Sequence, residues 1–171
     1  MAGRYLEVKF KISDDSGFLA IFNPAKYSSF VGGEWELDEL LNHFEDQIKE
    51  KNLLIWGTGG FGDYEVEIRS GMTAFEGFRS VTGTIGVSEG VLYLINYESL
   101  TMGAQFEDIK LPEKHLADLA IPLENGAYNC RIIQVNNPYQ YSSNDHADFI
   151  LELEKCGGKT FERDQIPWFI R

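Results

Sequence analysis

The chain has 171 residues, the length of one domain spanning 1–171, and its 43% hydrophobic and 13% aromatic content is typical of a folded globular protein and excludes a disordered one. Its 15 basic and 27 acidic residues give a net charge of −12, which disfavours nucleic acid and anionic membranes as partners and favours a basic protein or simple solubility. We expect a cytoplasmic protein, because the sequence has neither a run of about 20 apolar residues nor the apolar core of a signal peptide.

The N-terminal segment predicts a β-hairpin. Apolar and charged residues alternate from Leu6 to Ile12, as in a strand with one buried face. The residues from Asp14 to Gly17 have turn chemistry, and an apolar run continues to Phe22. We therefore expect these two strands to pair with each other.

One amphipathic helix is predicted, from about Glu36 to about Lys51. Its apolar residues recur at the spacing of a single helical face: Leu37, Leu40, Leu41, Phe44 and Ile48. The same periodicity places an acidic group on the opposite, solvent-facing side: Glu39, His43, Asp46 and Glu50. Such a group could hold a cation weakly, but a solvated helix face explains it without a metal.

Seven further segments predict strands, by alternation or as short apolar runs: 53–56, 64–69, 81–87, 91–97, 119–123, 128–135 and 148–154. No second periodic helix is present to connect parallel strands. The expected fold is therefore mainly β, α+β by element count: an antiparallel β-sandwich with one amphipathic helix.

The glycine-rich stretch from Gly57 to Gly62 has the spacing G-x-G-x-x-G of a dinucleotide-binding loop. That loop requires a following helix, whose amides hold the pyrophosphate, whereas the residues from Asp63 to Ile68 alternate as a strand. We interpret the stretch as a hairpin connection, and we expect no cofactor.

Other chemical signatures are weak. Ser142, Ser143, Asp145 and His146 include the residue types of a hydrolase triad, but neither serine lies in a nucleophile elbow. Cys130 and Cys156 have neither the number of a disulfide framework nor the spacing of a zinc site. We expect no metal, a buried apolar role for Cys130, a turn position for Cys156, and no enzymatic activity.

Two pairs of carboxylates each share a strand face, as the acids of glycosidases do: Glu65 with Glu67, and Glu152 with Glu154. The solvent face of an amphipathic strand explains both pairs equally well.

The loop from Asn136 to Asp145 has the composition of a recognition loop. Tyr139 and Tyr141 offer large contact areas at low entropic cost, and neighbouring Ser and Asn residues adapt their hydrogen bonds. The alternative is a long hairpin connection whose tyrosines pack back on the sheet. The sequence leaves both open.

The C-terminal half resembles a known family. The segment Ile121-Pro122-Leu123-Glu124-Asn125-Gly126-Ala127-Tyr128, a strand, and the segment from Asp145 to Leu153 look like the bacterial DNA-entry nuclease inhibitors of the competence J type. The resemblance extends back to about Val81 and leaves the N-terminal half unmatched. It implies a protein that inhibits a nuclease by binding it, and it identifies no functional residue.

We therefore expect an acidic protein that binds a basic partner, as an inhibitor or immunity protein for a nuclease or toxin. The expected partner-binding residues are Glu39, Asp46, Glu50, Glu65 and Glu67, with Tyr139, Tyr141 and Asp145 in the loop. The alternative is a module that binds a sugar or another small molecule through the tyrosine loop. A flat or convex acidic patch would favour the inhibitor, and a concave aromatic-lined groove would favour the ligand-binding module.

Overall fold

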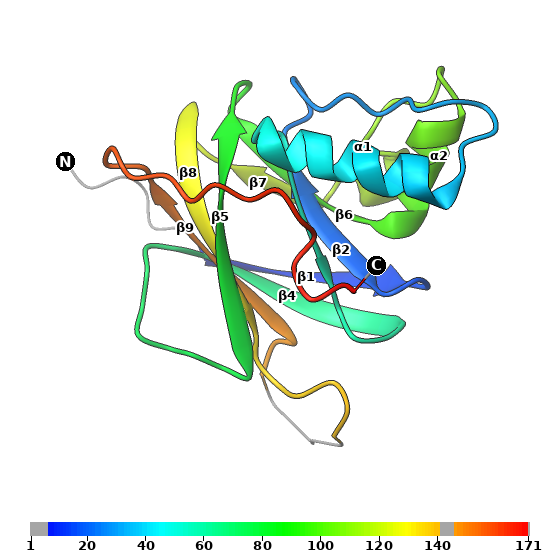
Figure 1. Ribbon diagram of the computed structural model, residues 1–171. Coiled ribbons are helices and arrows are strands. Elements are labelled where there is room, and N and C mark those ends of the chain that lie inside the picture. The colour runs from blue at the N-terminus through cyan, green and yellow to red at the C-terminus, as the bar shows by residue number, and fades with distance from the viewer. Residues whose placement is uncertain (1–6, 141–145, 171) are drawn as a thin grey trace.

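The computed structural model describes residues 7–140 and 146–170, which form two β-sheets and two α-helices (Figure 1). One sheet has five strands in the order β1 (Glu7–Asp14), β4 (Gly62–Ser70), β9 (Phe149–Lys155), β8 (Gly126–Gln134) and β5 (Arg79–Val87). The other has four, in the order β3 (Leu53–Gly57), β2 (Phe18–Phe22), β6 (Val91–Asn96) and β7 (Ala120–Pro122). The predicted β-sandwich is confirmed. No helix in the described ranges is long and apolar enough to cross a membrane.

The four-stranded sheet is buried on both faces. In β2, Leu19 and Ile21 share the face of Trp56, which contacts Phe149 of the five-stranded sheet, whereas Phe22 is on the face covered by the helices. This double burial explains why β2, β3 and β6 are nearly continuous apolar runs, while β1 alternates.

The first helix, α1 (Leu37–Lys49), packs on β3. A capping box at Glu36 and Glu39 satisfies its first amides. Phe44 and the other apolar residues of the stripe are fully buried, except Leu37, which is the first residue of the helix and is 55% exposed. Its predicted inward position is wrong.

A second helix, α2 (Tyr97–Gln105), begins directly after β6 and packs on β6 and β2. This helix was not predicted, because its buried positions include small or polar residues such as Ser99 and Gly103 instead of an apolar stripe. The available signal was Asn96, whose side chain accepts a hydrogen bond from the amide of Ser99 at 3.0 Å as an N-cap does. A short 3₁₀ helix, Lys114–Leu116, follows.

The predicted N-terminal hairpin is wrong, because β1 and β2 belong to different sheets. The turn between them is held by Asp14, whose carboxylate accepts hydrogen bonds from the amides of Gly17 at 2.6 Å and Phe18 at 2.9 Å. Gly17 has φ of +87°, a conformation that glycine adopts without strain. The chain therefore crosses from one sheet to the other.

The glycine-rich loop makes the same crossing in reverse, from β3 to β4, so its interpretation as a hairpin connection is also wrong. Since β1 pairs with β4 and β2 pairs with β3, the two crossings must lie side by side at one end of the sandwich. The amide of Thr58 donates to the carbonyl of Gly17 at 2.8 Å and joins them. The antiparallel prediction has one exception: β4 and β9 pair in parallel.

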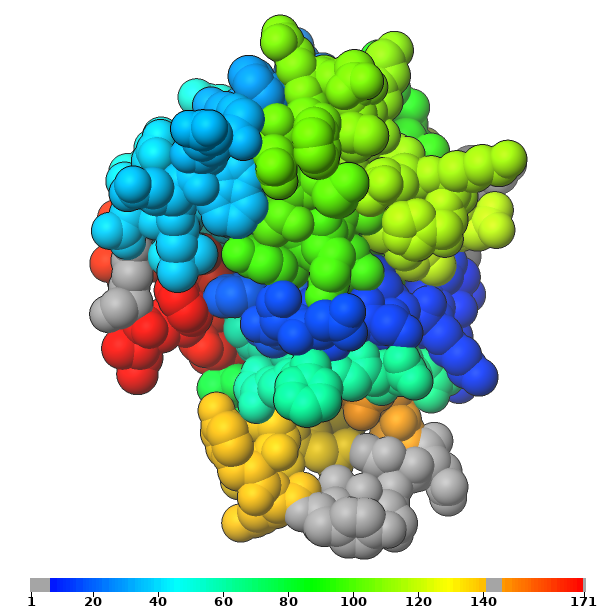
Figure 2. Space-filling model, turned by 90° about the vertical axis from the view of Figure 1, so that its right-hand side faces the viewer, coloured from blue at the N-terminus to red at the C-terminus, as the bar shows by residue number. Residues whose placement is uncertain are grey.

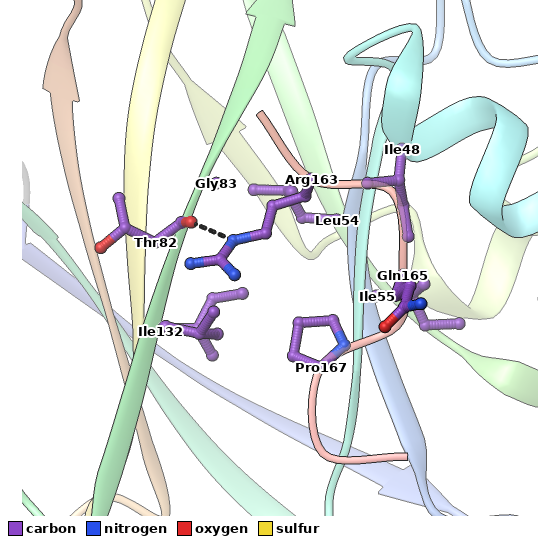
Figure 3. A pocket seen from close by; sticks show the side chains of 10 residues that line it. Ile48, Leu54, Ile55, Thr82, Gly83, Ile132, Arg163, Gln165 and Pro167 are labelled. Carbon is purple, nitrogen blue, oxygen red and sulfur yellow. Dashed lines mark hydrogen bonds between the residues drawn. The ribbon is translucent and has the colours of Figure 1, made fainter. Parts of the chain in front are cut away.

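The C-terminal segment closes one side of the sandwich, between the edge strands β5 and β3 (Figure 1). Arg163 Nε donates to the carbonyl of Thr82 at 2.7 Å (Figure 3), and the amide of Gly57 donates to the carbonyl of Pro167 at 3.0 Å. The space beneath this segment has a free volume of only about 10 Å³. It holds about one water molecule at most and is no ligand site.

Candidate functional site

The acidic residues of α1 lie on the exposed side of the helix, as expected. Asp46 and Glu50 are exposed, and Glu50 accepts long hydrogen bonds of 3.4 Å from the side-chain amides of Gln47 and Asn52. Glu39 has a structural task, because its Oε1 accepts from the amide of Glu36 at 3.1 Å. Asp46 and Glu50 are therefore the members of this group best placed for a partner.

Glu65 and Glu67 do not join these residues on one surface. Their strand, β4, is in the five-stranded sheet, with both carboxylates on the face away from the core, whereas α1 covers the far side of the other sheet. Glu67 is also buried, and its Oε2 pairs with Arg69 Nη2 at 2.7 Å. The single acidic face expected from the sequence is divided between two sides of the molecule.

The interpretation of the second carboxylate pair as solvent-facing is wrong for Glu152, which is fully buried. Its Oε1 lies 3.1 Å from Arg131 Nη1 and accepts a hydrogen bond from the backbone amide of Thr73, and its Oε2 accepts one from the Thr73 hydroxyl. Glu152 therefore fixes the segment between β4 and β5 onto the sheet. This is a structural ion pair.

The loop after β8 is described up to Gln140, and Tyr141, Ser142, Ser143 and Asp145 lie outside the described residues. Tyr139 is 73% exposed, so its ring does not pack back on the sheet as the structural alternative expected. Its neighbour Pro138 lies against Gly59 of the glycine-rich loop, where an added Cβ would come within 2.6 Å of Pro138 Cγ.

A groove forms where the two crossings meet the C-terminal segment, and its volume is about 320 Å³. Figure 2 shows this end, where the turn after β1, the glycine-rich loop and the C-terminal segment lie next to one another. The residues that line it are Asp15, Ser16, Gly17, Phe18, Gly57, Gly59, Gly60, Phe61, Trp168 and Phe169. Sequence reasoning missed this groove, because its three segments are far apart in the chain.

Carboxylates surround the turn that forms one wall of the groove. Asp14 is almost fully buried, and this burial together with the nearby Glu98 raises the pKa of its carboxyl from 3.8 to about 6. Glu98 of α2 accepts a hydrogen bond from the amide of Asp15 with Oε1. The turn is therefore held by two carboxylates, Asp14 and Glu98, which repel each other when both are ionised.

We expect the free energy of unfolding of the variant Asp14→Asn to increase relative to that of the wild type between pH 4 and pH 7. A raised pKa means that the folded protein binds the proton more tightly, so the wild-type contribution to stability falls as the pH rises from about 4 to about 6. Asn keeps an oxygen acceptor and does not titrate there. Chemical denaturation between pH 4 and 7 should show a shift on the order of 2 kcal/mol between the two proteins. A difference that is constant with pH would contradict it.

The glycine-rich loop lacks the structure of a nucleotide site. The strand β4 follows it where a dinucleotide-binding loop would lead into a helix, and Asp63 adds a negative charge. We expect that neither NAD nor ATP raises the melting temperature, because a ligand that binds only the folded state must stabilise it. A melting series up to millimolar nucleotide checks this, and a concentration-dependent increase would contradict it.

Cys130 is buried as expected, and desolvation raises the pKa of its thiol, which keeps it protonated and unreactive. Cys156 is partly exposed at the end of β9 and, like Cys130, is a free thiol. Among the described residues, no group of three or more His, Cys, Asp or Glu side chains is arranged to hold a metal ion.

Comparison with solved structures shows two proteins with the same fold. The first, described as crocagin biosynthetic gene J, superposes with a TM-score of 0.58 at 16% identity over 91% of this chain and 99% of its own. The second is ComJ from Bacillus subtilis, described as an inhibitor of the DNA-degrading activity of NucA, with a TM-score of 0.54 at 13% identity over 90% of this chain and 100% of its own. The similarity therefore covers the N-terminal half as well, and the expected restriction to the C-terminal half is wrong.

No protein-family model and no curated protein sequence matches the chain. At this level of identity, structural similarity shows the fold alone.

Proposed function

We propose that this protein is a non-enzymatic inhibitor that binds a basic nuclease, or a toxin of that kind, and masks its nucleic-acid-binding surface. The observation that carries the proposal is the agreement of its fold with ComJ, a nuclease inhibitor, over 90% of this chain. The net charge of −12 supports it, because a nucleic-acid-binding surface is basic and attracts carboxylates.

Carboxylates that occupy the positions of phosphates would block the nucleic acid directly. Exposed charges also accelerate the encounter of the two proteins, and salt weakens this steering because charges more than about 8 Å apart are screened at physiological ionic strength. Asp46 and Glu50 on α1 are the exposed carboxylates that we assign to this steering. Inhibition should therefore be strongest at low salt.

To test the proposal, the purified protein is immobilised and used to capture DNA-degrading activity from an extract of its native source. The captured nuclease is identified and assayed with and without added free protein. We expect DNA degradation to fall in proportion to the protein added. Failure to capture any DNA-degrading activity, or an activity that the protein does not reduce, would reject the inhibitor.

The double variant Asp46→Lys, Glu50→Lys is expected to slow association with this nuclease and to reduce the dependence of the association rate on salt. Stability should change by less than about 0.5 kcal/mol per site, because both positions are exposed. Glu39 is left unchanged to preserve the capping box. Association is measured by surface plasmon resonance over a salt series.

The control variant is Glu7→Lys, Glu154→Lys, which changes the net charge equally on the five-stranded sheet. It should affect association much less. Equal rates for the two variants at every salt concentration would reject α1 as the steering surface.

A specific observation also favours the second candidate, a module that binds a sugar or another small molecule. The groove beside Trp168 is concave and aromatic-lined, as such a module requires, and its volume of about 320 Å³ lies at the lower end of the range for small-molecule pockets. It is formed by the turn after β1, the glycine-rich loop and the C-terminal segment, not by the described part of the tyrosine loop.

A further inference from the structure

The groove between the two crossings combines exposed rings with a carboxylate. Phe61 projects from the glycine-rich loop with 81% of its surface exposed, although a large apolar side chain usually lies inside a protein. Phe18 and Phe169 also line the groove, with their ring centroids 5.0 Å apart in an edge-to-face contact. Trp168, in the C-terminal segment that closes the sandwich, lines the groove as well.

The backbone around the groove is shaped to hold these rings. Trp168 has φ of +62°, a left-handed conformation that is unfavourable for a bulky residue. Gly57 makes room for it, because a Cβ at this position would lie 2.6 Å from the carbonyl oxygen of Trp168. A strained aromatic residue that the surrounding structure fixes beside an open groove points to a binding role.

The indole of Trp168 forms a cation–π contact with a side chain of this protein, Arg79. The guanidinium carbon of Arg79 lies 4.4 Å from the centroid of this ring, and Arg79 Nε is fixed by a hydrogen bond of 2.6 Å to Gln134 Oε1. Arg79 does not line the groove. It supports the ring from outside the described lining of the groove.

The charge of the groove is negative. Asp15 lines it directly, and Asp63, whose Oδ1 accepts from Ser13 Oγ at 2.5 Å, follows Phe61 closely in the chain. Asp14 and Glu98 lie behind the same turn. No lysine or arginine is among the described lining residues.

We propose that this groove binds an arginine side chain of the basic protein partner. A guanidinium stacks on aromatic rings and pairs with a carboxylate at the same time, so it matches Phe61, Trp168 and Asp15 together. A sugar would need several converging polar side chains, whereas Asp15 and Ser16 are the polar side chains among the lining residues. This inference rests on the proposed function for the partner's basic character, but it assigns a contact distinct from the α1 surface.

With this contact, association and dissociation of the partner depend on two different parts of the protein. Exposed carboxylates on α1 would determine how fast the partner arrives, whereas a buried arginine among aromatic rings would determine how slowly it leaves. Substitutions in the groove should therefore act on dissociation and be less sensitive to salt than substitutions on α1.

The first experiment uses no nuclease. The labelled protein is titrated with the peptide acetyl-Gly-Arg-Gly-Arg-Gly-amide and with its lysine counterpart, and amide and indole N–H signals are followed by NMR. Glycine signals are well separated, so Gly17, Gly59 and Gly60 report on the groove, whereas Gly32 and Gly157 report on surfaces away from it. We expect the arginine peptide to shift the groove signals and the Trp168 indole signal, with an affinity at least 5-fold higher than that of the lysine peptide.

The variant Asp15→Asn, Phe61→Ala removes one carboxylate and one exposed ring from the groove. The matched control, Asp118→Asn, Leu37→Ala, removes one carboxylate and one exposed apolar side chain at positions that do not line the groove. All four side chains are exposed, so both variants should fold, and their spectra verify this. We expect the groove variant to bind the arginine peptide at least 10-fold more weakly and the control to bind it within 2-fold of the wild type.

Several results would overturn the inference: no shift of the groove signals, equal affinity for the lysine peptide, or equal losses in the two variants. Shifts caused by maltose or N-acetylglucosamine without any caused by the arginine peptide would overturn it in favour of the ligand-binding module. The nuclease assay separates this inference from the proposed function. Peptide binding in the groove without nuclease inhibition rejects the inhibitor and retains the groove, whereas inhibition that is unchanged in the groove variant rejects the groove and retains the inhibitor.

Discussion

Replacing Phe44 with alanine is expected to lower the free energy of unfolding by about 3 to 5 kcal/mol, the usual cost of removing a buried phenylalanine. Phe44 has no exposed surface and contacts the ring of Tyr97 at a centroid distance of 6.5 Å, so the substitution leaves a cavity between α1 and the four-stranded sheet. Urea denaturation of the two proteins measures the difference.

Leu37→Ala is the control for this experiment. The sequence pattern places Leu37 in the same apolar stripe, but the structure leaves it 55% exposed, and we expect its loss to cost less than about 1 kcal/mol. Similar costs at Phe44 and Leu37 would show that α1 does not pack as described.

Replacing Arg131 with methionine is expected to destabilise the protein by about 3 to 5 kcal/mol, because it leaves the fully buried carboxylate of Glu152 without its cation. Adding Glu152→Gln to this variant removes the unpaired charge and should recover part of the stability at neutral pH. Denaturation of the single and double variants measures both effects.

The control for this pair is Lys155→Met, which breaks the ion pair between Lys155 and Glu124. Both of these side chains are exposed, so the solvent already compensates their charges and the stability should hardly change. A loss as large as that of Arg131→Met would mean that burial of Glu152 is not the cause.

The sequence by itself determined the local structure of most of the chain. Alternation in β1 and β4 predicts one buried face each, and the apolar stripe of α1 predicts a helix within two residues of its observed ends. The net charge and the lack of catalytic motifs pointed to a binding protein. The strand and helix patterns can be predicted because the spacing of neighbouring residues alone decides which side chains share a face.

Only the tertiary structure decided which strands pair and which polar groups are buried. A period of two shows that β1 and β2 are strands, but not that Asp14 directs the chain from one sheet to the other, nor that β4 and β9 run parallel. Glu67 and Glu152 have the spacing of solvent-facing residues, yet both are buried and paired with arginines.

The groove is the clearest example of a feature that the sequence does not predict. Asp15, Phe61 and Trp168 are separated by many residues and come together because the pairings of β1 with β4 and of β2 with β3 place both crossings at one end. The C-terminal segment reaches them only because Gly57 has no side chain to block it. Such a site arises from long-range pairing and close backbone approach, and neither leaves a periodic signal in the sequence.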